Sequence, residues 1–244
     1  MPGAVMGRLL DERASTLFDP TKFIYIGTAD SGTRICVTYQ SSPVKTYADA
    51  VAKKTIVAAS QAGGATRDYA ALHNHVTGTK FDIISGYKGT SDILLAIERG
   101  EVAGMCGFDW SSLKSQKPDW LRDKAINILV QDGIDPEPEL TKIGVPQIWS
   151  FIKDDMDRKA VELVLSQQLF GRSYVVPPDT ASEAVAILRK AFTAAMSDKD
   201  LLADAERIRI SISYSSGEKL QDVVQRVHAS SKEVIDHAKR IIEP

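Results

Sequence analysis

Cysteine is scarce in this 244-residue chain, which contains only Cys36 and Cys106. Two cysteines are too few for a disulfide-based fold, and they lack the C-x-x-C spacing of zinc or redox motifs. The histidines offer no alternative, because His73 and His75 stand two positions apart on a predicted helix and face different sides, where we expect surface positions. The sequence therefore predicts neither a metal site nor a bound cofactor.

The chain also lacks an excess of charge of one sign and a long apolar run. Lys and Arg number 30 against 32 Asp and Glu, which leaves a formal net charge of -2. This balance gives no reason to expect nucleic acid or an anionic membrane as a partner. No apolar run approaches the roughly 18 residues that span a bilayer, and the opening MPGAVMGRLLDERAS lacks the basic and apolar regions of a secretory signal. A small, specific ligand is the partner that this composition favours.

Catalytic signatures are missing as well. The sequence contains no G-x-S-x-G elbow, no Walker loop, no H-E-x-x-H and no G-x-G-x-x-G motif. Glu98, Glu101 and Asp109 could be imagined as an acid–base pair, but charged residues beside helix ends are usually solvated caps. The residues therefore give no support to an enzyme.

What is present is an alternation of short apolar strands and helices, which predicts an α/β fold. Helices separate the predicted strands 55–60, 81–85, 102–108 and 125–131. This order implies a parallel sheet covered on both faces. After residue 154 the chain is largely helical, with predicted helices at 154–170, 182–196, 199–208, 217–228 and 232–242, and with short strands near 174 and at 210–214.

The stretch ASQAGGATRDYAA joins a predicted strand to a helix through a Gly-Gly loop. The first backbone N–H groups of such a helix are unpaired, and the positive end of the helix dipole lies behind them, which makes an anion site. Gly63, Gly64 and Ala65 would let a ligand approach the backbone, and Ser60 and Thr66 would add hydroxyl groups. The alternative is an ordinary connection in which Thr66 caps the helix.

A second candidate is GFDWSS, at the carboxyl end of a predicted strand, where open α/β sheets place their ligands. Asp109 could accept a hydrogen bond from a ligand, Trp110 could form an apolar wall, and Ser111 could donate. The alternative places Trp110 in the core and uses Asp109 or Ser111 as a helix cap. Spacing alone does not choose between the two.

Several segments follow one another in an order typical of one protein family: FDPTKFIYIG, SSPVKTYADAVA, ASQAGGATRDYAA, ISGYKGTSDILLAIERGEVAG and VVPPDTASEAVAILRKAF. They resemble the strand entry, the Pro-x-Lys-Thr helix start, the Gly/Ser loop, the Tyr-Lys-Gly turn and the Pro-rich return strand of the receptors of tripartite tricarboxylate transporters. This is the TctC or Bug family. The resemblance runs from about Leu17 to the end of the chain.

The resemblance implies a periplasmic-binding-protein fold of type II, with two α/β lobes that are joined by crossing strands and close on a small solute. Lobe one would comprise 1–36 and 174–244, and lobe two would comprise 37–173. Such receptors capture a small organic acid in the periplasm and deliver it to membrane permease subunits. The resemblance further implies a monomer without enzymatic activity.

The resemblance also assigns residues to the ligand. The loop from Ser60 to Thr66 would hold a carboxylate, and the Asp109–Ser111 segment would face the ligand from the same lobe. Other contacts would come from Gly27, Thr28 and Ala29 of lobe one, and from Tyr87 to Thr90 beside the cleft.

The sequence departs from the family at its beginning. Family members start with a signal peptide and then a strand that ends in a Pro-Gly-Gly-type loop, and this sequence shows neither. We therefore expect lobe one to be incomplete at its N-terminus, lacking about one β-α-β unit of 30 or more residues. Two other classes stay open: a cytosolic ligand-sensing domain of the same fold, as in LysR-type regulators, and an enzyme on an α/β scaffold.

The resemblance also implies that the two cysteines lie on neighbouring strands. In the expected sheet of lobe two, the strand that carries Cys36 runs antiparallel beside the strand that carries Cys106. In an oxidising periplasm the pair would form a disulfide. The alternative is two neighbouring buried thiols, since cysteine often serves as a small core residue.

Overall fold

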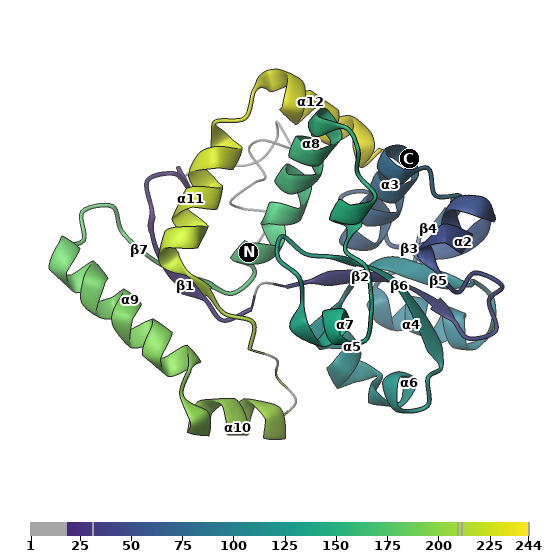
Figure 1. Ribbon diagram of the computed structural model, residues 1–244, viewed down its shortest axis with the longest axis horizontal. Coiled ribbons are helices and arrows are strands. Elements are labelled where there is room, and N and C mark those ends of the chain that lie inside the picture. Colours follow the sequence, from purple (N-terminus) through teal and green to yellow (C-terminus); the bar gives the residue numbers. More distant parts are fainter. Residues whose placement is uncertain (1–18, 31, 209, 211, 244) are drawn as a thin grey trace. The chain divides into compact units, whose positions relative to one another are not determined.

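The computed structural model describes residues 19–30, 32–208, 210 and 212–243 of the chain (Figure 1). The chain forms two compact units, of which unit 1 is Met1–Gly32 with Leu163–Ile235, and unit 2 is Thr33–Glu162 with Asp236–Pro244. Residues 1–18, the expected start of lobe one, lie outside the described residues. Among the described residues no helix combines the length and the apolar character needed to cross a membrane.

The bounds of the units differ from those expected at both crossings. Arg34–Tyr39 forms strand β2 and pairs with two strands of unit 2, so the first crossing lies before Arg34 and not after Cys36. The second boundary falls inside helix α8, Asp155–Ser166, ahead of the expected position at residue 174.

Unit 2 is built on a sheet of five strands in the order β4-β3-β5-β2-β6. Its elements are β2, α2 (Tyr47–Ala52), β3 (Thr55–Ala59), α3 (Ala65–Thr77), β4 (Phe81–Ser85), α4 (Thr90–Glu98), β5 (Gly104–Asp109), α5 (Trp110–Gln116), α6 (Pro118–Arg122), β6 (Ile126–Asp132), α7 (Pro138–Lys142) and a 3₁₀ turn at Ile148–Ser150. Helix α3 lies on one face of the sheet, and α4, α5 and α6 lie on the other (Figure 1).

The expectation of a parallel sheet holds for part of unit 2 only. Strand β3 is parallel to both β4 and β5, whereas β2 is antiparallel to β5 and β6. The parallel strands are those that helical crossovers connect, since a crossover returns the chain to the same end of the sheet. Strand β2 precedes β3 in the chain and lies between β5 and β6, antiparallel to both.

Strand β2 sends alternate side chains to the two faces of the sheet. Ile35 and Val37 join the buried apolar cluster that also contains Trp110 and residues of α4, whereas Cys36, between them in sequence, points to the face that carries α3. The Sγ atoms of Cys36 and Cys106 form a disulfide, and the two Cα atoms are 3.9 Å apart. The expected antiparallel arrangement of the two strands is confirmed.

A bulge in β5 interrupts the β2–β5 ladder next to this disulfide. Ile35 lies opposite Phe108 and Val37 opposite Met105, so β5 contains one extra residue. Gly107 supplies the left-handed backbone of the bulge, with φ of 68°. A Cβ atom at Gly107 would lie 2.3 Å from the carbonyl oxygen of Ala65. The absence of a side chain therefore lets the first turn of α3 sit directly on the end of β5.

Replacing Gly107 with alanine tests this close approach. Gly144 provides a matched control, because its φ is 79° and nothing lies within 4 Å of an added Cβ. Both variants incur the left-handed penalty of about 1–2 kcal/mol, and Gly107→Ala incurs a further overpacking cost of about 1–3 kcal/mol. Urea unfolding measures both losses, and equal losses would contradict the role of Gly107 in seating α3.

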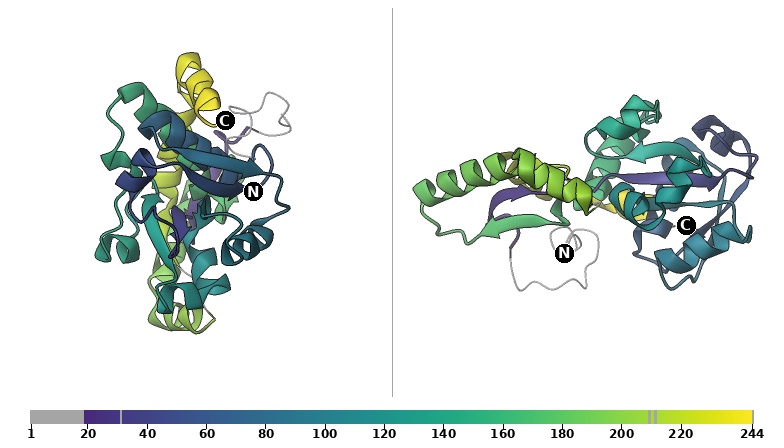
Figure 2. Two further views of the ribbon diagram at one scale, coloured as in Figure 1. Left: turned by 90° about the vertical axis from the view of Figure 1, so that its right-hand side faces the viewer. Right: turned by 90° about the horizontal axis from the view of Figure 1, so that it is seen from below.

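Unit 1 is built around a smaller sheet in the order β7-β1-β8. Its elements are β1 (Ile24–Thr28), the end of α8, a 3₁₀ turn at Gln167–Phe170, β7 (Ser173–Val176), α9 (Ser182–Met196), α10 (Lys199–Arg207), β8 (Ser215–Ser216), α11 (Gly217–His228) and the start of α12 (Lys232–Ile241). Helices α9 and α11 lie on the same side of β1 and β7 (Figure 2).

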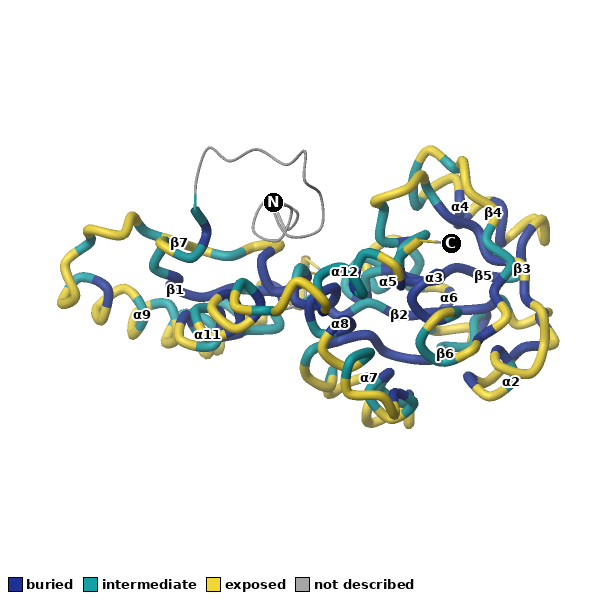
Figure 3. Tube along the Cα trace, turned by 90° about the horizontal axis from the view of Figure 1, so that it is seen from above, coloured by how far each residue is buried: buried dark blue, intermediate teal, exposed yellow. Residues whose placement is uncertain are grey.

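Strand β1 is the buried centre of unit 1, whereas β7 is largely exposed (Figure 3). Tyr25 of β1 packs edge-on against Phe170, with ring centroids 5.6 Å apart. Strand β8 is shorter and later than the expected strand at 210–214. It contains only Ser215 and Ser216, which pair with Thr28 and Gly27, while Ser213 forms only an isolated bridge to Asp30. Part of the expected strand, Ser211, lies outside the described residues.

The difference between the two sheets predicts a difference in local stability. Unit 1 leaves the apolar side chains of Tyr174, Val175, Ile187 and Leu188 exposed, and its strand β8 has only two residues. Fewer buried contacts therefore oppose local opening of its backbone hydrogen bonds. We expect hydrogen exchange, read by mass spectrometry, to be slower in β3 and β5 than in β1. Equal protection of the two sheets would contradict this expectation.

Candidate functional site

A cavity of about 690 Å³ opens within unit 2, at the edge of the sheet where β3, β4 and β5 end. This is the edge at which parallel α/β sheets place ligands, because each strand there turns into a loop and a helix N-terminus. Three segments supply most of the lining, namely 60–66 after β3, 86–90 after β4 and 107–109 at the end of β5, and Arg34, Ser112 and Gln116 complete it. All of these residues belong to unit 2.

The loop after β3 presents the N-terminus of α3 to the cavity. Gly64 is the N-cap residue and has no side chain to cap the helix, so the first-turn amides lack a capping acceptor. Thr66 lies inside the helix and is not its cap. Its Oγ1 accepts a hydrogen bond from the backbone N–H of Ser60 at 2.8 Å and lies 2.9 Å from Ser60 Oγ. The two hydroxyl groups therefore close the loop and hold the helix end in place.

The loop after β4 presents a second helix N-terminus. Gly89 is the N-cap residue of α4, and no side chain caps this helix either. The backbone N–H of Tyr87 donates to the carbonyl of Ala59 at 3.3 Å, which ties this loop to the end of β3. Lys88 is exposed beside the cavity. Two helix dipoles and a cation therefore give this part of the lining a positive potential.

Asp109 and Arg34 form the charged end of the cavity. Asp109 caps α5, because its Oδ1 accepts hydrogen bonds from Ser112 N at 2.8 Å and Ser111 Oγ at 2.7 Å. Burial alone would raise the pKa of Asp109, but these hydrogen bonds and the charge of Arg34 lower it below its ordinary value. Arg34 lies opposite Asp109 in the β2–β5 ladder, and its guanidinium donates to the carbonyl of Gly107 at 3.1 Å. Asp109 is therefore ionised and has a neighbouring cation.

Trp110 and Ser111 do not line this cavity. Trp110 is 7% exposed and packs in the apolar cluster of unit 2. Its indole Nε1 donates to Glu139 Oε2 at 2.8 Å, and Lys114 Nζ donates to the same oxygen. The structure therefore has the alternative arrangement, with Trp110 in the core and Asp109 as the cap.

The candidates from lobe one lie in unit 1. Gly27 and Thr28 end β1, and a Cβ at Gly27 would meet the ring of Phe192 at 2.6 Å. Thr28 is fully buried, and its hydroxyl donates to the carbonyl of Asp30 at 3.0 Å. Ala29 accepts a hydrogen bond from Ser213 N at 2.9 Å. Their expected role toward a ligand stays a prediction.

Sequence reasoning missed Arg34, Ser112 and Gln116. Arg34 begins the strand that carries Cys36, and the antiparallel pairing expected for Cys36 and Cys106 places it near Asp109 when the ladder is extended. The sequence therefore carried a signal for Arg34. Ser112 and Gln116 reach the cavity from α5. Ser112 ends the candidate stretch GFDWSS but received no role there, and no motif marks Gln116.

The histidine expected at the surface is instead part of the core. His73 is fully buried on α3. Its Nδ1 lies 2.7 Å from Tyr47 Oη, and its Nε2 lies 3.2 Å from Asp132 Oδ2. These two partners come from distant parts of the sequence, which is why the helix pattern alone did not predict the burial. His75, two residues later, is exposed as expected.

Asp68 stands beside the α3 N-terminus and titrates near neutral pH. Its side chain is 15% exposed, and burial raises its pKa to about 6, although the hydrogen bond from Gly63 N and the charge of Arg67 oppose the shift. A protonated Asp68 removes a negative charge from the neighbourhood of the cavity.

This raised pKa predicts a pH-dependent contribution to stability. Between about pH 4 and pH 6 the folded chain retains the Asp68 proton and the unfolded chain releases it, so this contribution is present below pH 4 and is lost as the pH rises to 6. The full change is at most about 3 kcal/mol. Unfolding of the wild type and Asp68→Asn across this range gives a difference that isolates the group. A difference independent of pH would contradict the shift.

Comparisons with known proteins agree with this architecture. No protein-family model matches the sequence, and no curated protein matches it either. Among solved structures, the chain is similar to a TctC solute-binding protein from Polaromonas, determined without ligand. The TM-score is 0.66 at 18% identity, over 91% of this chain and 72% of that one.

Two further structures come from Rhodopseudomonas palustris. One was determined with adipate, with a TM-score of 0.60 and 19% identity over 97% of this chain and 75% of that one. The other is MatC with bound malate, with a TM-score of 0.56 and 16% identity over 99% and 77%. The resemblance expected from the sequence is confirmed at the level of the fold, and the chain has the type II periplasmic-binding-protein fold of TctC proteins.

Proposed function

We propose that this chain is a solute-binding receptor that takes a small organic acid, with a ligand carboxylate against the N-terminus of α3. The observation that carries the proposal is the cavity of unit 2, onto which two helices open without a capping side chain. A carboxylate there gains charge-assisted hydrogen bonds from backbone amides and the favourable end of two dipoles. A neutral or cationic solute gains neither.

The charges of the lining support an acid in particular. Lys88 and Arg34 add positive charge, and Asp109, which also lines the cavity, already accepts hydrogen bonds from Ser111 and Ser112. The volume of about 690 Å³ is within the range typical of small-molecule sites. The adipate and malate in the two structures of similar fold are both dicarboxylates, which makes dicarboxylates the first compounds to test.

The wider role follows from the same proposal. A receptor of this fold would act in the periplasm as a monomer, without catalysis, and would pass its ligand to the membrane permease subunits of a tripartite-type transporter. These parts rest on the resemblance of the sequence segments and of the fold, and the cavity itself supports only the binding step.

The first experiment compares acids with their uncharged counterparts. Adipate and malate are expected to raise the melting temperature of the chain, and adipamide and malamide, of nearly the same shape, are not. A ligand at a hundredfold excess over its Kd stabilises by about 2.7 kcal/mol, or roughly 5–10 °C for a chain of this size. Equal shifts in melting temperature for acid and amide would contradict the proposal that the site recognises a carboxylate. If no small organic acid raised the melting temperature, the proposal that the chain is a receptor for such acids would be wrong.

A charge variant locates the site. Ala62 lines the cavity and is exposed, whereas a Cβ at Gly64 would lie 2.2 Å from Ser60 Oγ and disturb the loop. Ala62→Asp is expected to weaken binding of a stabilising acid at least about tenfold, or about 1.4 kcal/mol. Ala62→Asn has the same size without the charge and serves as the control. Equal affinities of the two variants, measured by calorimetry, would place the anion elsewhere.

A further inference from the structure

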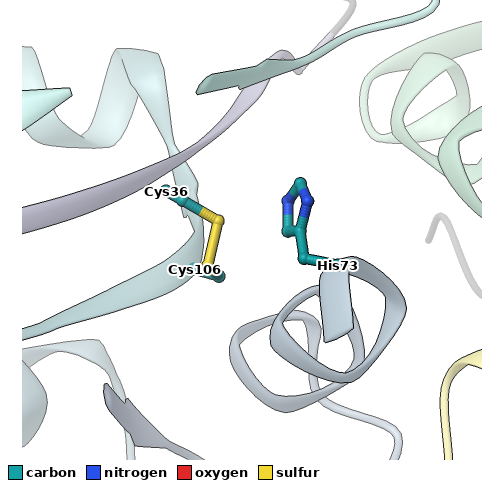
Figure 4. A group of neighbouring side chains, drawn as sticks. All are labelled: Cys36, His73 and Cys106. Atoms are coloured by element: carbon teal, nitrogen blue, oxygen red, sulfur yellow. A yellow bond between two sulfur atoms is a disulfide. The ribbon is translucent and has the colours of Figure 1, made fainter. Parts of the chain in front are cut away.

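Three potential metal ligands meet in the core of unit 2, apart from the cavity lining. They are Cys36 of β2, Cys106 of β5 and His73 of α3, and their ligand atoms all lie within 4.8 Å of one another. All three residues are fully buried. Figure 4 shows the imidazole of His73 beside the disulfide, on the face of the sheet that α3 covers. Each residue comes from a different element, so tertiary packing holds the group together.

Two hydrogen-bonding partners fix the orientation of the imidazole. Tyr47 Oη lies 2.7 Å from one ring nitrogen and Asp132 Oδ2 lies 3.2 Å from the other. Both partners are buried. Histidines that bind metals usually donate their second nitrogen to a carboxylate or another acceptor, which sets the ring orientation. A metal on either nitrogen of His73 would replace one of these hydrogen bonds and leave the other to hold the ring.

We propose that the reduced form of this chain binds a thiophilic divalent metal ion, Zn²⁺ in the first place, through Cys36, Cys106 and His73. The disulfide prevents this, because a metal requires thiolates. A dithiol reductant opens the S–S bond by two-electron transfer, becomes a disulfide itself and leaves one proton on each sulfur. Metal binding then releases these two protons to solvent.

The charge balance suits a buried site. One divalent ion and two thiolates sum to zero, so the complex places no net charge in the core, where an isolated ion would be strongly disfavoured. Two sulfurs and one imidazole nitrogen are a typical donor set for Zn²⁺ and supply three of its four tetrahedral positions. The oxidation state of the cysteines thus selects between a covalent and a metal link joining β2 to β5.

The test uses the full chain in both oxidation states. The protein is reduced with a phosphine under anaerobic conditions, and the reductant is removed. Co²⁺ is then titrated, and the thiolate-to-cobalt charge-transfer band reports binding. We expect one Co²⁺ per reduced chain, displaced by Zn²⁺, and none in the oxidised chain. Circular dichroism shows whether the reduced chain is folded. A folded reduced chain that takes up no cobalt, or a disulfide that opens only on unfolding, would overturn the proposal.

Variants identify the ligands. The double variant Cys36→Ala/Cys106→Ala is expected to lose the band. With the metal on Nδ1, Asp132 stays on Nε2 as the orienting carboxylate, and Asp132→Asn is then expected to bind about 10–100-fold more weakly. His75→Ala is the matched control and keeps wild-type affinity, because His75 is exposed on the same helix. If the double variant does not fold, the comparison of the reduced and oxidised wild-type chains is the test. Equal cobalt binding by these two forms would then contradict the proposed site.

Discussion

The pairing of β2 with β5 is the constraint on which the rest of unit 2 depends. One antiparallel ladder with one bulge brings Arg34 opposite Asp109 and joins Cys36 to Cys106. The bulge also places Gly107 against the first turn of α3, where a side chain would not fit. The Arg34–Asp109 pair, the disulfide and the contact between Gly107 and the first turn of α3 therefore all depend on the register of this one ladder. A slip of one residue would move all three at once.

The proposed anion site would rely on the backbone more than on side chains. Glycine is the N-cap residue of both α3 and α4, so no side chain caps their first backbone amides. The hydroxyl groups of Ser60 and Thr66 form a hydrogen bond with each other. This hydrogen bond and the one from Ser60 N to Thr66 Oγ1 close the loop without a ligand, and a loop formed in advance loses less entropy on binding. Specificity for one acid over another would then depend on the few charged side chains of the lining, which are Arg34, Lys88 and Asp109 among the described residues.

Trp110 and His73 are two side chains whose burial was not predicted by the local sequence pattern. Trp110 follows a strand end, which is a common place for ligand contacts, yet its indole N–H donates to Glu139 and the apolar cluster covers its ring. His73 stands on a polar-looking stretch of helix, yet Tyr47 and Asp132 satisfy both of its nitrogens in the core. In each case the deciding partner lies far away in the sequence, beyond the reach of any local pattern.

The sequence by itself determined what depends on neighbours along the chain. Periodicity and glycine positions located the helix Ser182–Met196 and the loop from Ser60 to Thr66, because helix periodicity and capping are local. Only the tertiary structure decided that β2 lies between β5 and β6, that Trp110 packs in the core, and that a histidine shares the buried space of the two cysteines. Those outcomes depend on contacts between distant segments, and such contacts form only when the whole sheet is assembled.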